Sequence, residues 1–163
     1  LGHRKIGYVG TDLKRIFSAD RKAGYMLALA ENNVPFQENY YLEMPQVPKN
    51  KTNRLLRFLS REDRPTAVLV SDDILAMVLE KTAFELHLQI PEDLSIISFN
   101  NSLFSKLSSP QLTSIDINSR QLGIEAASQM INHIENPGLL ATKIIVPHFM
   151  IERQSCAPPK APR

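Results

Sequence analysis

Polar side chains follow the expected strands of this sequence, where each strand gives way to a loop or a helix. The polar ones are Thr11, Asp12, Lys14, Arg15, Arg21, Ser71, Asp72, Asp73, Asn100, Asn101 and Asn118, and Phe17 lies among them. The set combines carboxylates and amides with arginine and one aromatic ring. Carboxylates accept hydrogen bonds from adjacent hydroxyls, arginine donates in a fork, and a ring covers a sugar face. This mixture therefore suits an uncharged, polyhydroxylated ligand.

These residues meet only if the chain alternates between strands and helices, and its apolar pattern predicts that alternation. Strands are expected at 5–9, 39–43, 65–70, 94–99 and 112–117, and helices at about 18–32, 55–59, 73–86 and 119–134. This order is typical of βαβ units with right-handed crossovers. We expect an α/β fold with a doubly wound, mainly parallel sheet and helices on both faces. Ligands of such sheets bind at the carboxyl ends of the strands.

The end of the chain departs from this alternation. Two further strands are expected at 144–146 and 149–151, with only Pro147 and His148 between them. They form either a tight hairpin or one strand bent at a crossing between two sheets. The prolines of the tail predict a disordered end at 158–163.

Composition narrows the class of protein. The chain has 163 residues, 43% of them hydrophobic and 22% charged, as in one soluble globular domain. Its formal net charge of +2 is too small for a nucleic-acid footprint. Cys156 is the only cysteine, which favours a reducing cytosol. No apolar run is long enough to span a bilayer, and the first residues start no signal peptide. Because a buried strand begins almost at once without a Met, we expect the later part of something longer.

Several candidate residues also have purely structural interpretations. Arg21 could be the solvated partner of an acid, and Asp73 could be a helix N-cap. Asn100 and Asn101 could satisfy the backbone of a turn, and Phe17 could pack in the core. The pattern leaves both interpretations open.

Other ligands and activities have less support. Lys14 and Arg15 could bind phosphate, but Gly10 is the only glycine of their loop, and neither GxGxxG nor a P-loop is present. No GxSxG elbow occurs, and the histidines are scattered without metal-ligand spacing. The pair Asp72 and Asp73 lacks the other residues of a phospho-accepting receiver. We expect no enzyme, no cofactor and no metal.

Five blocks of sequence, in order, resemble the effector-binding core of the lactose/galactose-repressor (LacI/GalR) family of bacterial transcription regulators. They are "RKIGYVG…SADRKAGY", "PTAVLVSDDILAMV", "IPEDLSIISFNNS", "PQLTSIDINSRQLGIEAA" and "IIVPHFMIERQSC", and they span about Arg4 to Cys156. Within the family, "NNS…LTSIDIN" and "IIVP…IERQSC" are most similar to maltose-operon repressors of Gram-positive bacteria.

The resemblance implies one lobe of a two-lobed sensor that binds its effector between the lobes. By it, residues 1–117 form the C-terminal lobe, 118–147 return to an N-terminal lobe whose remainder is absent, and 148–157 form the final strand. The implied function is sensing of a sugar, maltose or a related oligosaccharide, by a repressor of a sugar-utilisation operon. Lobe closure would change operator binding by an N-terminal helix-turn-helix that this chain lacks. The implied protein is a cytoplasmic homodimer that contacts no membrane.

The resemblance also assigns site residues. Arg21 matches an arginine that clamps the effector, Asp72 a polar contact that is often asparagine, and Asp73 the acid that follows it. Asn100 falls where many members have aspartate, which favours an amide that both donates and accepts. The expected effector-binding residues are Arg21, Asp72, Asn100, Phe17, Arg15, Asp12 and Asp73.

A dimer surface is implied as well. Its expected residues are Met77, Val78, Lys81, Leu103, Phe104 and Leu107. The alternative is that the leucines and Phe104 belong to the core. For the protein as a whole, the alternatives are a sugar-binding protein of a transport system and an enzyme of flavodoxin-like shape.

Overall fold

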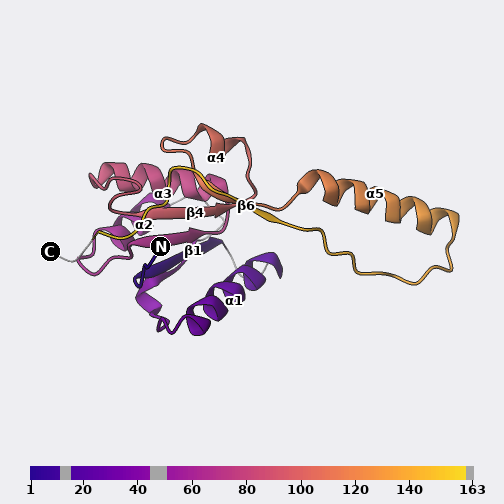
Figure 1. Ribbon diagram of the computed structural model, residues 1–163, viewed down its shortest axis with the longest axis horizontal. Helices are drawn as coiled ribbons and strands as arrows, with labels where there is room; N and C mark the ends of the chain where they lie inside the picture. The colour runs from indigo at the N-terminus through magenta and orange to yellow at the C-terminus, as the bar shows by residue number, and fades with distance from the viewer. Residues whose placement is uncertain (12–15, 45–50, 161–163) are drawn as a thin grey trace.

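The computed structural model describes residues 1–11, 16–44 and 51–160, with the backbone alone for 16, 17 and 51. The described chain forms a six-stranded sheet with the order β2-β1-β3-β4-β5-β6 (Figure 1). Its strands are β1 (Ile6–Thr11), β2 (Tyr41–Met44), β3 (Ala67–Val70), β4 (Ser95–Phe99), β5 (Thr113–Asp116) and β6 (Phe149–Ile151). The strands β1 to β5 pair in parallel, and β6 pairs antiparallel with β5. The expected α/β fold with a mainly parallel sheet is confirmed.

Helices cover the sheet on both faces. The described helices are α1 (Ile16–Glu31), α2 (Lys51–Leu59), α3 (Asp73–Glu85), α4 (Leu103–Leu107) and α5 (Ser119–Glu135), with a short 3-10 helix η1 (Glu38–Tyr40) before β2. Figure 1 shows α1 on one side of the sheet and α2 and α3 on the other. A parallel sheet needs such cover because its strands are apolar on both faces.

Alternation along β1 divides the core into two parts. Val9 points to the side of α2 and α3, where it joins a buried cluster with Val70, Leu79 and Ile96. Tyr8 points to the side of α1, where it packs with Tyr25, Leu29 and Val34. The sheet is thus anchored on both faces, and the ends of its strands are held in fixed positions.

The start of α3 differs in detail from expectation. Asp72, not Asp73, is the N-cap: its side chain accepts a hydrogen bond from the backbone N–H of Leu75 at 2.8 Å. An N-cap side chain satisfies one of the N–H groups that have no partner within the helix. The N-cap interpretation of Asp73 is therefore wrong by one residue.

Other expectations need correction as well. The strand expected at 39–43 begins as the 3-10 helix η1 and becomes β2 only at Tyr41, and α4 was not expected as a helix. The strand expected at 144–146 is absent, so the chain there makes neither a hairpin nor a bent strand. A strand forms only where its backbone groups find a partner, and no described strand lies beside this segment.

The helix α5 stands apart from the sheet. It projects away from it in Figure 1, and none of its residues is buried. Apolar side chains lie along it in contact with solvent, among them Met130, Ile131 and Ile134. None of the described helices combines the length and apolar character that crossing a bilayer requires.

Candidate functional site

Arg21 reaches from α1 across the carboxyl ends of two strands. Its Nη1 donates a short hydrogen bond to the backbone oxygen of Ser71, just after β3, and its Nη2 donates to Oδ1 of Asn100, just after β4, at 3.3 Å. Its guanidinium carbon lies 4.4 Å from the ring centroid of Phe99, within range of a cation–π interaction. The structure therefore brings Arg21 and Asn100 together at the expected edge of the sheet.

Electrostatics at Arg21 reflect this position. Burial lowers the pKa of the guanidinium, while the nearby Tyr8, Asp72 and Asp73 act in the opposite direction. An arginine side chain nonetheless remains protonated in proteins. The site thus contains a fixed positive charge that is partly removed from water, which strengthens any hydrogen bond that it donates.

Asp72 lies at the same edge but has a structural task. One carboxylate oxygen caps α3, and the other accepts from the hydroxyl of Ser71 at 3.2 Å. An ionised carboxylate offers about four acceptor positions. Asp72 can therefore hold the helix and still accept a hydrogen bond from a ligand.

Asp73 faces the interior instead. Its side chain is 1% exposed. Its carboxylate accepts from the hydroxyls of Ser98 at 2.5 Å and Ser114 at 2.8 Å, and from the backbone N–H of Ser102 at 2.6 Å. These bonds join the beginning of α3 to β4, β5 and the loop before α4. From the interior, Asp73 thus fixes the positions of the segments that form the carboxyl edge of the sheet.

Two asparagines follow β4 in an unusual backbone conformation. Asn100 has a φ of 100° and Asn101 a φ of 47°. Asparagine tolerates this region better than most residues. The turn aims the side chain of Asn100 at Arg21, whereas Asn101 donates from Nδ2 to Oδ2 of Asp116 at 2.9 Å. The interpretation that these two side chains satisfy the backbone of the turn is therefore wrong: Asn100 binds the side chain of Arg21, and Asn101 binds those of Asp116 and Arg153.

A polar network ties this turn to the segments by which the chain leaves and re-enters the sheet. Arg153, after β6, donates to Oδ1 of Asn101 and to the backbone oxygen of Leu112 at 2.6 Å. Asp116 accepts from the backbone N–H of Asn118, at the start of α5, at 2.7 Å. These hydrogen bonds from Asn101 and Asn118 lower the pKa of Asp116.

Some expected site residues lie outside the described chain, and some residues of the site were not expected. Asp12, Lys14 and Arg15 lie outside the described residues, as does the side chain of Phe17. Two residues were missed by the sequence reasoning: Phe99 under Arg21, and Arg153. The signal for Phe99 was its place as the last residue of an apolar strand, directly before the asparagine pair. The signal for Arg153 was only its place after the final strand.

A cavity of about 970 Å³ lies between α1 and the sheet, and Arg21 and Phe99 are among the residues that line it. Its walls are mainly apolar, formed by residues such as Tyr25, Leu29 and Ile97. The strand ends themselves carry the polar groups, so a hydroxylated ligand fits there better than in this cavity.

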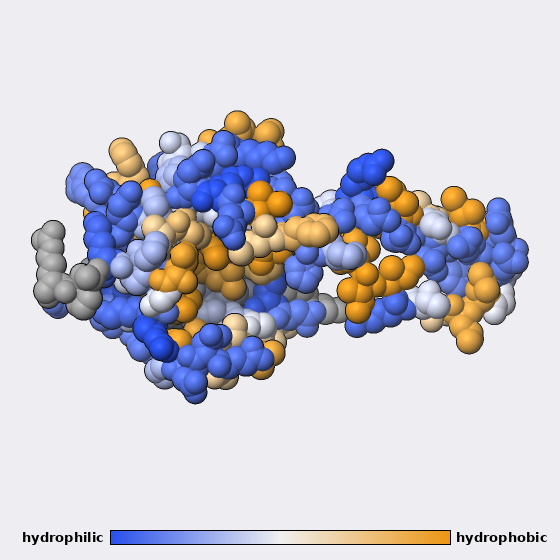
Figure 2. Space-filling model, in the orientation of Figure 1, coloured by the Kyte–Doolittle hydropathy of each residue, from blue (hydrophilic) through white to orange (hydrophobic). Residues whose placement is uncertain are grey.

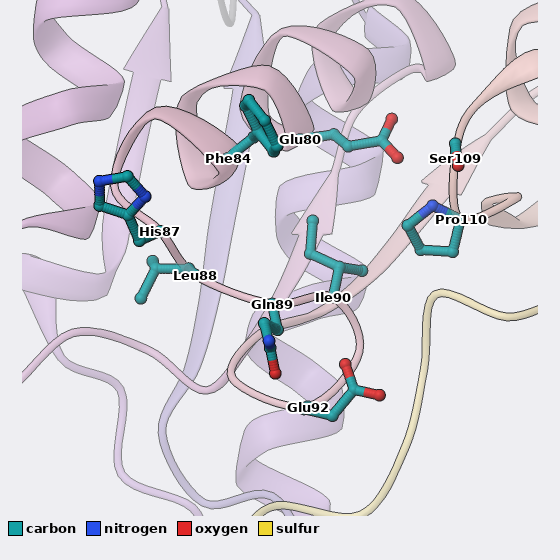
Figure 3. Close-up of a pocket in the computed structure, with 9 residues that line it drawn as sticks. All are labelled: Glu80, Phe84, His87, Leu88, Gln89, Ile90, Glu92, Ser109 and Pro110. Atoms are coloured by element: carbon teal, nitrogen blue, oxygen red, sulfur yellow. The ribbon is translucent and has the colours of Figure 1, made fainter.

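A second hollow, of about 550 Å³, lies at the C-terminal end of α3 (Figure 3). Glu80, Leu88, Ile90 and Pro110 line it, and burial raises the pKa of Glu80. Because α3 runs back from the carboxyl edge of β3, this hollow lies toward the other edge of the sheet. It does not belong to the candidate site.

The expected dimer surface is only partly exposed. Leu103 and Leu107 on α4 are 66% and 68% exposed, and Phe104 is 43% exposed, so the core interpretation of these residues is wrong. Figure 2 shows apolar side chains over α4. Lys81 is exposed and Met77 half-buried, whereas Val78 packs against the core.

Two exposed apolar residues of α3, Ile74 and Phe84, were missed. Ile74 is 58% exposed and shares a stripe of the helix with Met77, Lys81 and Phe84, spaced three, four and three residues apart. Together, Ile74, Met77, Lys81, Phe84, Leu103, Phe104 and Leu107 are called the α3–α4 surface below.

Comparisons with known proteins agree with this architecture. A model of the family described as "Periplasmic binding protein-like domain" matches residues 1–156. The curated HTH-type transcriptional repressor PurR of Klebsiella pneumoniae (strain 342) is 33% identical over 156 residues, 96% of this chain and 46% of that protein. The chain spans about half the length of the curated relatives that it matches.

Solved structures of transcriptional regulators superpose on this chain as well. A protein described as a LacI transcriptional regulator, from Bacillus cereus subsp. cytotoxis NVH 391-98, superposes with a TM-score of 0.89 at 31% identity, over 96% of this chain and 55% of that one. The transcription regulator CcpA of Lactococcus lactis superposes with a TM-score of 0.82 at 28% identity, over 96% and 57% of the two chains. These relatives are transcriptional regulators and not enzymes.

Proposed function

Because the chain belongs to the periplasmic binding protein-like family, in the form found in LacI/GalR transcriptional regulators, we propose that it is the sugar-sensing lobe of a repressor. The proposed effector is maltose or a related oligosaccharide, and the proposed target is a sugar-utilisation operon. The operator would be bound by a helix-turn-helix outside this chain, and the proposed location is the cytoplasm.

The observation that carries the proposal is the position of Arg21. Its guanidinium joins the ends of β3 and β4 and stacks on Phe99, beside the amide of Asn100. A charged fork donor, an amide that both donates and accepts, and an aromatic face are the groups that bind a sugar. We propose Arg21, Asp72, Asn100 and Phe99 as effector contacts.

The remaining expected residues have other proposed roles. Asp73 is proposed to support the site from below, since its carboxylate is buried and bound to three donors. Asp12, Arg15 and Phe17 are proposed as contacts of the loop after β1, on the basis of their place in the sequence.

The detached part of the chain suggests how sensing works. We propose that residues 1–117 form one lobe, that 118–147 belong to a second lobe, that 148–157 return to the first and that 158–163 are a tail. The exposed apolar side chains of α5 support this division. A sugar bound between the lobes would favour the closed form by its difference in affinity, typically about 1–3 kcal/mol of coupling. The α3–α4 surface would join two copies in a homodimer.

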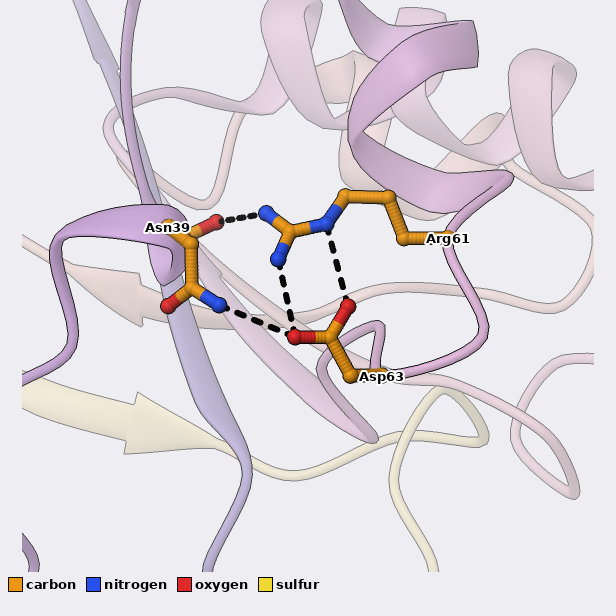
Figure 4. A network of polar contacts seen from close by, with 3 residues as sticks. All are labelled: Asn39, Arg61 and Asp63. Atoms are coloured by element: carbon orange, nitrogen blue, oxygen red, sulfur yellow. Dashed lines mark hydrogen bonds and ion pairs between the residues drawn. The ribbon is translucent and has the colours of Figure 1, made fainter.

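Titration of the full-length protein with maltose tests the proposed function. We expect heat of binding from the wild type and an affinity reduced about 10- to 100-fold in Arg21→Ala, because hydrogen bonds from a charged donor are lost. Arg61→Ala is the matched control. Arg61 binds Asp63 and Asn39 near the amino ends of β2 and β3, away from the site (Figure 4). Equal affinities of the wild type and Arg21→Ala would refute the proposed site.

A further inference from the structure

The hydroxyl of Tyr8 is a buried polar group without a partner. The side chain of Tyr8 is 1% exposed, and within the described part of the chain its Oη has no hydrogen-bond partner. Buried polar atoms of native proteins are nearly all hydrogen-bonded, so an orphaned hydroxyl calls for an explanation. An explanation by chain packing fails, since a phenylalanine would fill the same space without the cost of desolvating a hydroxyl.

The ring of Tyr8 points along β1 toward the candidate site. A methyl group at Gly10 would overlap the ring and lie 3.1 Å from Oη, so the ring covers Gly10, two residues nearer the carboxyl end. On its sides the ring is held by Tyr41, stacked at 5.7 Å, and by Tyr25 at 5.3 Å between centroids. The phenol oxygen is thereby fixed at the end of β1, where the sheet meets a ligand.

The charges that act on this hydroxyl belong to the same edge. Burial raises the pKa of Tyr8; Arg21 lowers it, while Asp72 and Glu43 raise it further. The net direction is upward, so the hydroxyl keeps its proton at neutral pH and can donate it in a hydrogen bond.

Tyr25 provides the contrast on the same face of the sheet. Its hydroxyl donates to the backbone oxygen of Ile6 at 2.8 Å, at the opposite end of β1. Tyr25 thus completes its hydrogen bonding within the chain, whereas Tyr8 does not. The two tyrosines touch each other and differ in this respect.

We propose that Tyr8 is a further effector-contacting residue, whose hydroxyl donates a hydrogen bond to one oxygen of the bound sugar, and that Gly10 gives the ring its path to the site. The inference rests on the proposed function and adds a specificity-determining residue to it. Because Tyr8 is closed to solvent in this conformation, the proposed contact requires that neighbouring side chains move aside when the sugar binds.

Calorimetric titration of the full-length protein with maltose, on Tyr8→Phe and Tyr25→Phe, tests the inference. We expect Tyr8→Phe to bind about 3- to 10-fold more weakly, as for one lost neutral hydrogen bond, with a thermal unfolding midpoint equal to or above that of the wild type. Tyr25→Phe is expected to unfold at a lower temperature and to bind maltose with unchanged affinity. A Tyr8→Phe affinity within twofold of the wild type would overturn the inference.

Monodeoxy analogues of maltose give a second readout, which a purely structural role would not move. One analogue should lack the sugar oxygen that Tyr8 binds. We expect the wild type to bind that analogue more weakly than maltose, and Tyr8→Phe to bind the analogue and maltose with equal affinity. If the wild type does not bind maltose, the proposed effector is wrong and the inference falls with it. If Arg21→Ala abolishes binding while Tyr8→Phe treats every analogue as the wild type does, only the role of Tyr8 is wrong.

Discussion

At the scale of single residues, Asp73 shows how a carboxylate shapes a binding edge from within. Its three hydrogen bonds hold Ser98, Ser102 and Ser114 around the beginning of α3. Two of the donors are hydroxyls of neighbouring strands, and the third is the backbone just after the asparagine turn. The direction of Asn100 therefore depends on a group that is itself out of reach of a ligand.

Replacing Asp73 by asparagine tests that dependence. The amide keeps the shape but presents N–H groups to donors, so we expect Asp73→Asn to lower the free energy of unfolding by about 2–4 kcal/mol. Asp72→Asn is the control, because asparagine is as good an N-cap as aspartate. Urea denaturation followed by circular dichroism measures both. Equal stabilities of the two variants would show that Asp73 does not organise the edge.

Asp116 predicts a dependence of stability on pH. The hydrogen bonds from Asn101 and Asn118 lower its pKa below the ordinary value of 3.8. The stabilisation is therefore complete above this value and is lost as the pH falls through the lower pKa of the folded state. We expect Asp116→Ala to be less stable than the wild type at pH 7 and the difference to shrink below about pH 4, as measured by chemical denaturation. A difference that is constant with pH would contradict this role.

The sequence allowed some of these residues to be predicted and not others. Arg21 and Asn100 could be found because strand ends of a parallel sheet meet at one edge. Phe99 had a signal in its place at the end of a strand, but Tyr8 had none, because apolar alternation indicates that a side chain is buried but not where along the strand its ring points. The burial of Asp73 depends on three donors from distant segments, which no local pattern reveals.

At the scale of elements, the α3–α4 surface presents apolar side chains to solvent. Ile74 and Phe84 lie on one stripe of α3, and Leu103 and Leu107 lie on α4 next to it. Exposed apolar patches of this kind often mark sites of interaction with another protein.

A charge on this surface should prevent self-association. We expect Leu107→Glu to shift the full-length protein from dimer to monomer at micromolar concentration, because a carboxylate would lose its water in the interface. Analytical ultracentrifugation measures the change. Leu27→Glu is the control, since Leu27 is an exposed leucine of α1, outside this surface. A Leu107→Glu variant that remains a dimer would place the interface elsewhere.

Elements with a complete apolar pattern were predictable. The strands β1, β3, β4 and β5 and the helices α1, α3 and α5 lie close to the expected ranges, because each carries a complete apolar pattern. The strand expected at 144–146 had the residue types but lacks a neighbour to bind its backbone. Residue types alone do not supply that neighbour.

At the scale of the whole molecule, α5 and residues 136–148 form an arm outside the sheet (Figure 1). Its apolar side chains include Leu140 and Ile145, which are 86% and 79% exposed. A second lobe that packs on these side chains would remove them from water.

Limited proteolysis can compare how readily the arm is cleaved in the 163-residue chain and in the full-length protein. We expect trypsin to cleave the 163-residue chain at Lys143 before it cleaves at Arg57 within α2, because Lys143 lies in exposed chain without secondary structure. In the full-length protein the same bond is expected to resist cleavage at least about tenfold longer, since a second lobe would cover it. Mass spectrometry of the fragments identifies the bond. Equal rates at Lys143 in both proteins would argue against a covering lobe.

The antiparallel pairing of β5 with β6 has a mechanical consequence. The outgoing and returning segments of the arm are locked side by side, with Asp116 opposite Phe149 and Ser114 opposite Ile151. This pairing resists sliding of the two segments past each other along the strand direction, because sliding would break the hydrogen bonds between β5 and β6. Asp116 at the end of β5 and Arg153 after β6 both bind Asn101, so the two ends of the arm are tied by hydrogen bonds to the asparagine turn.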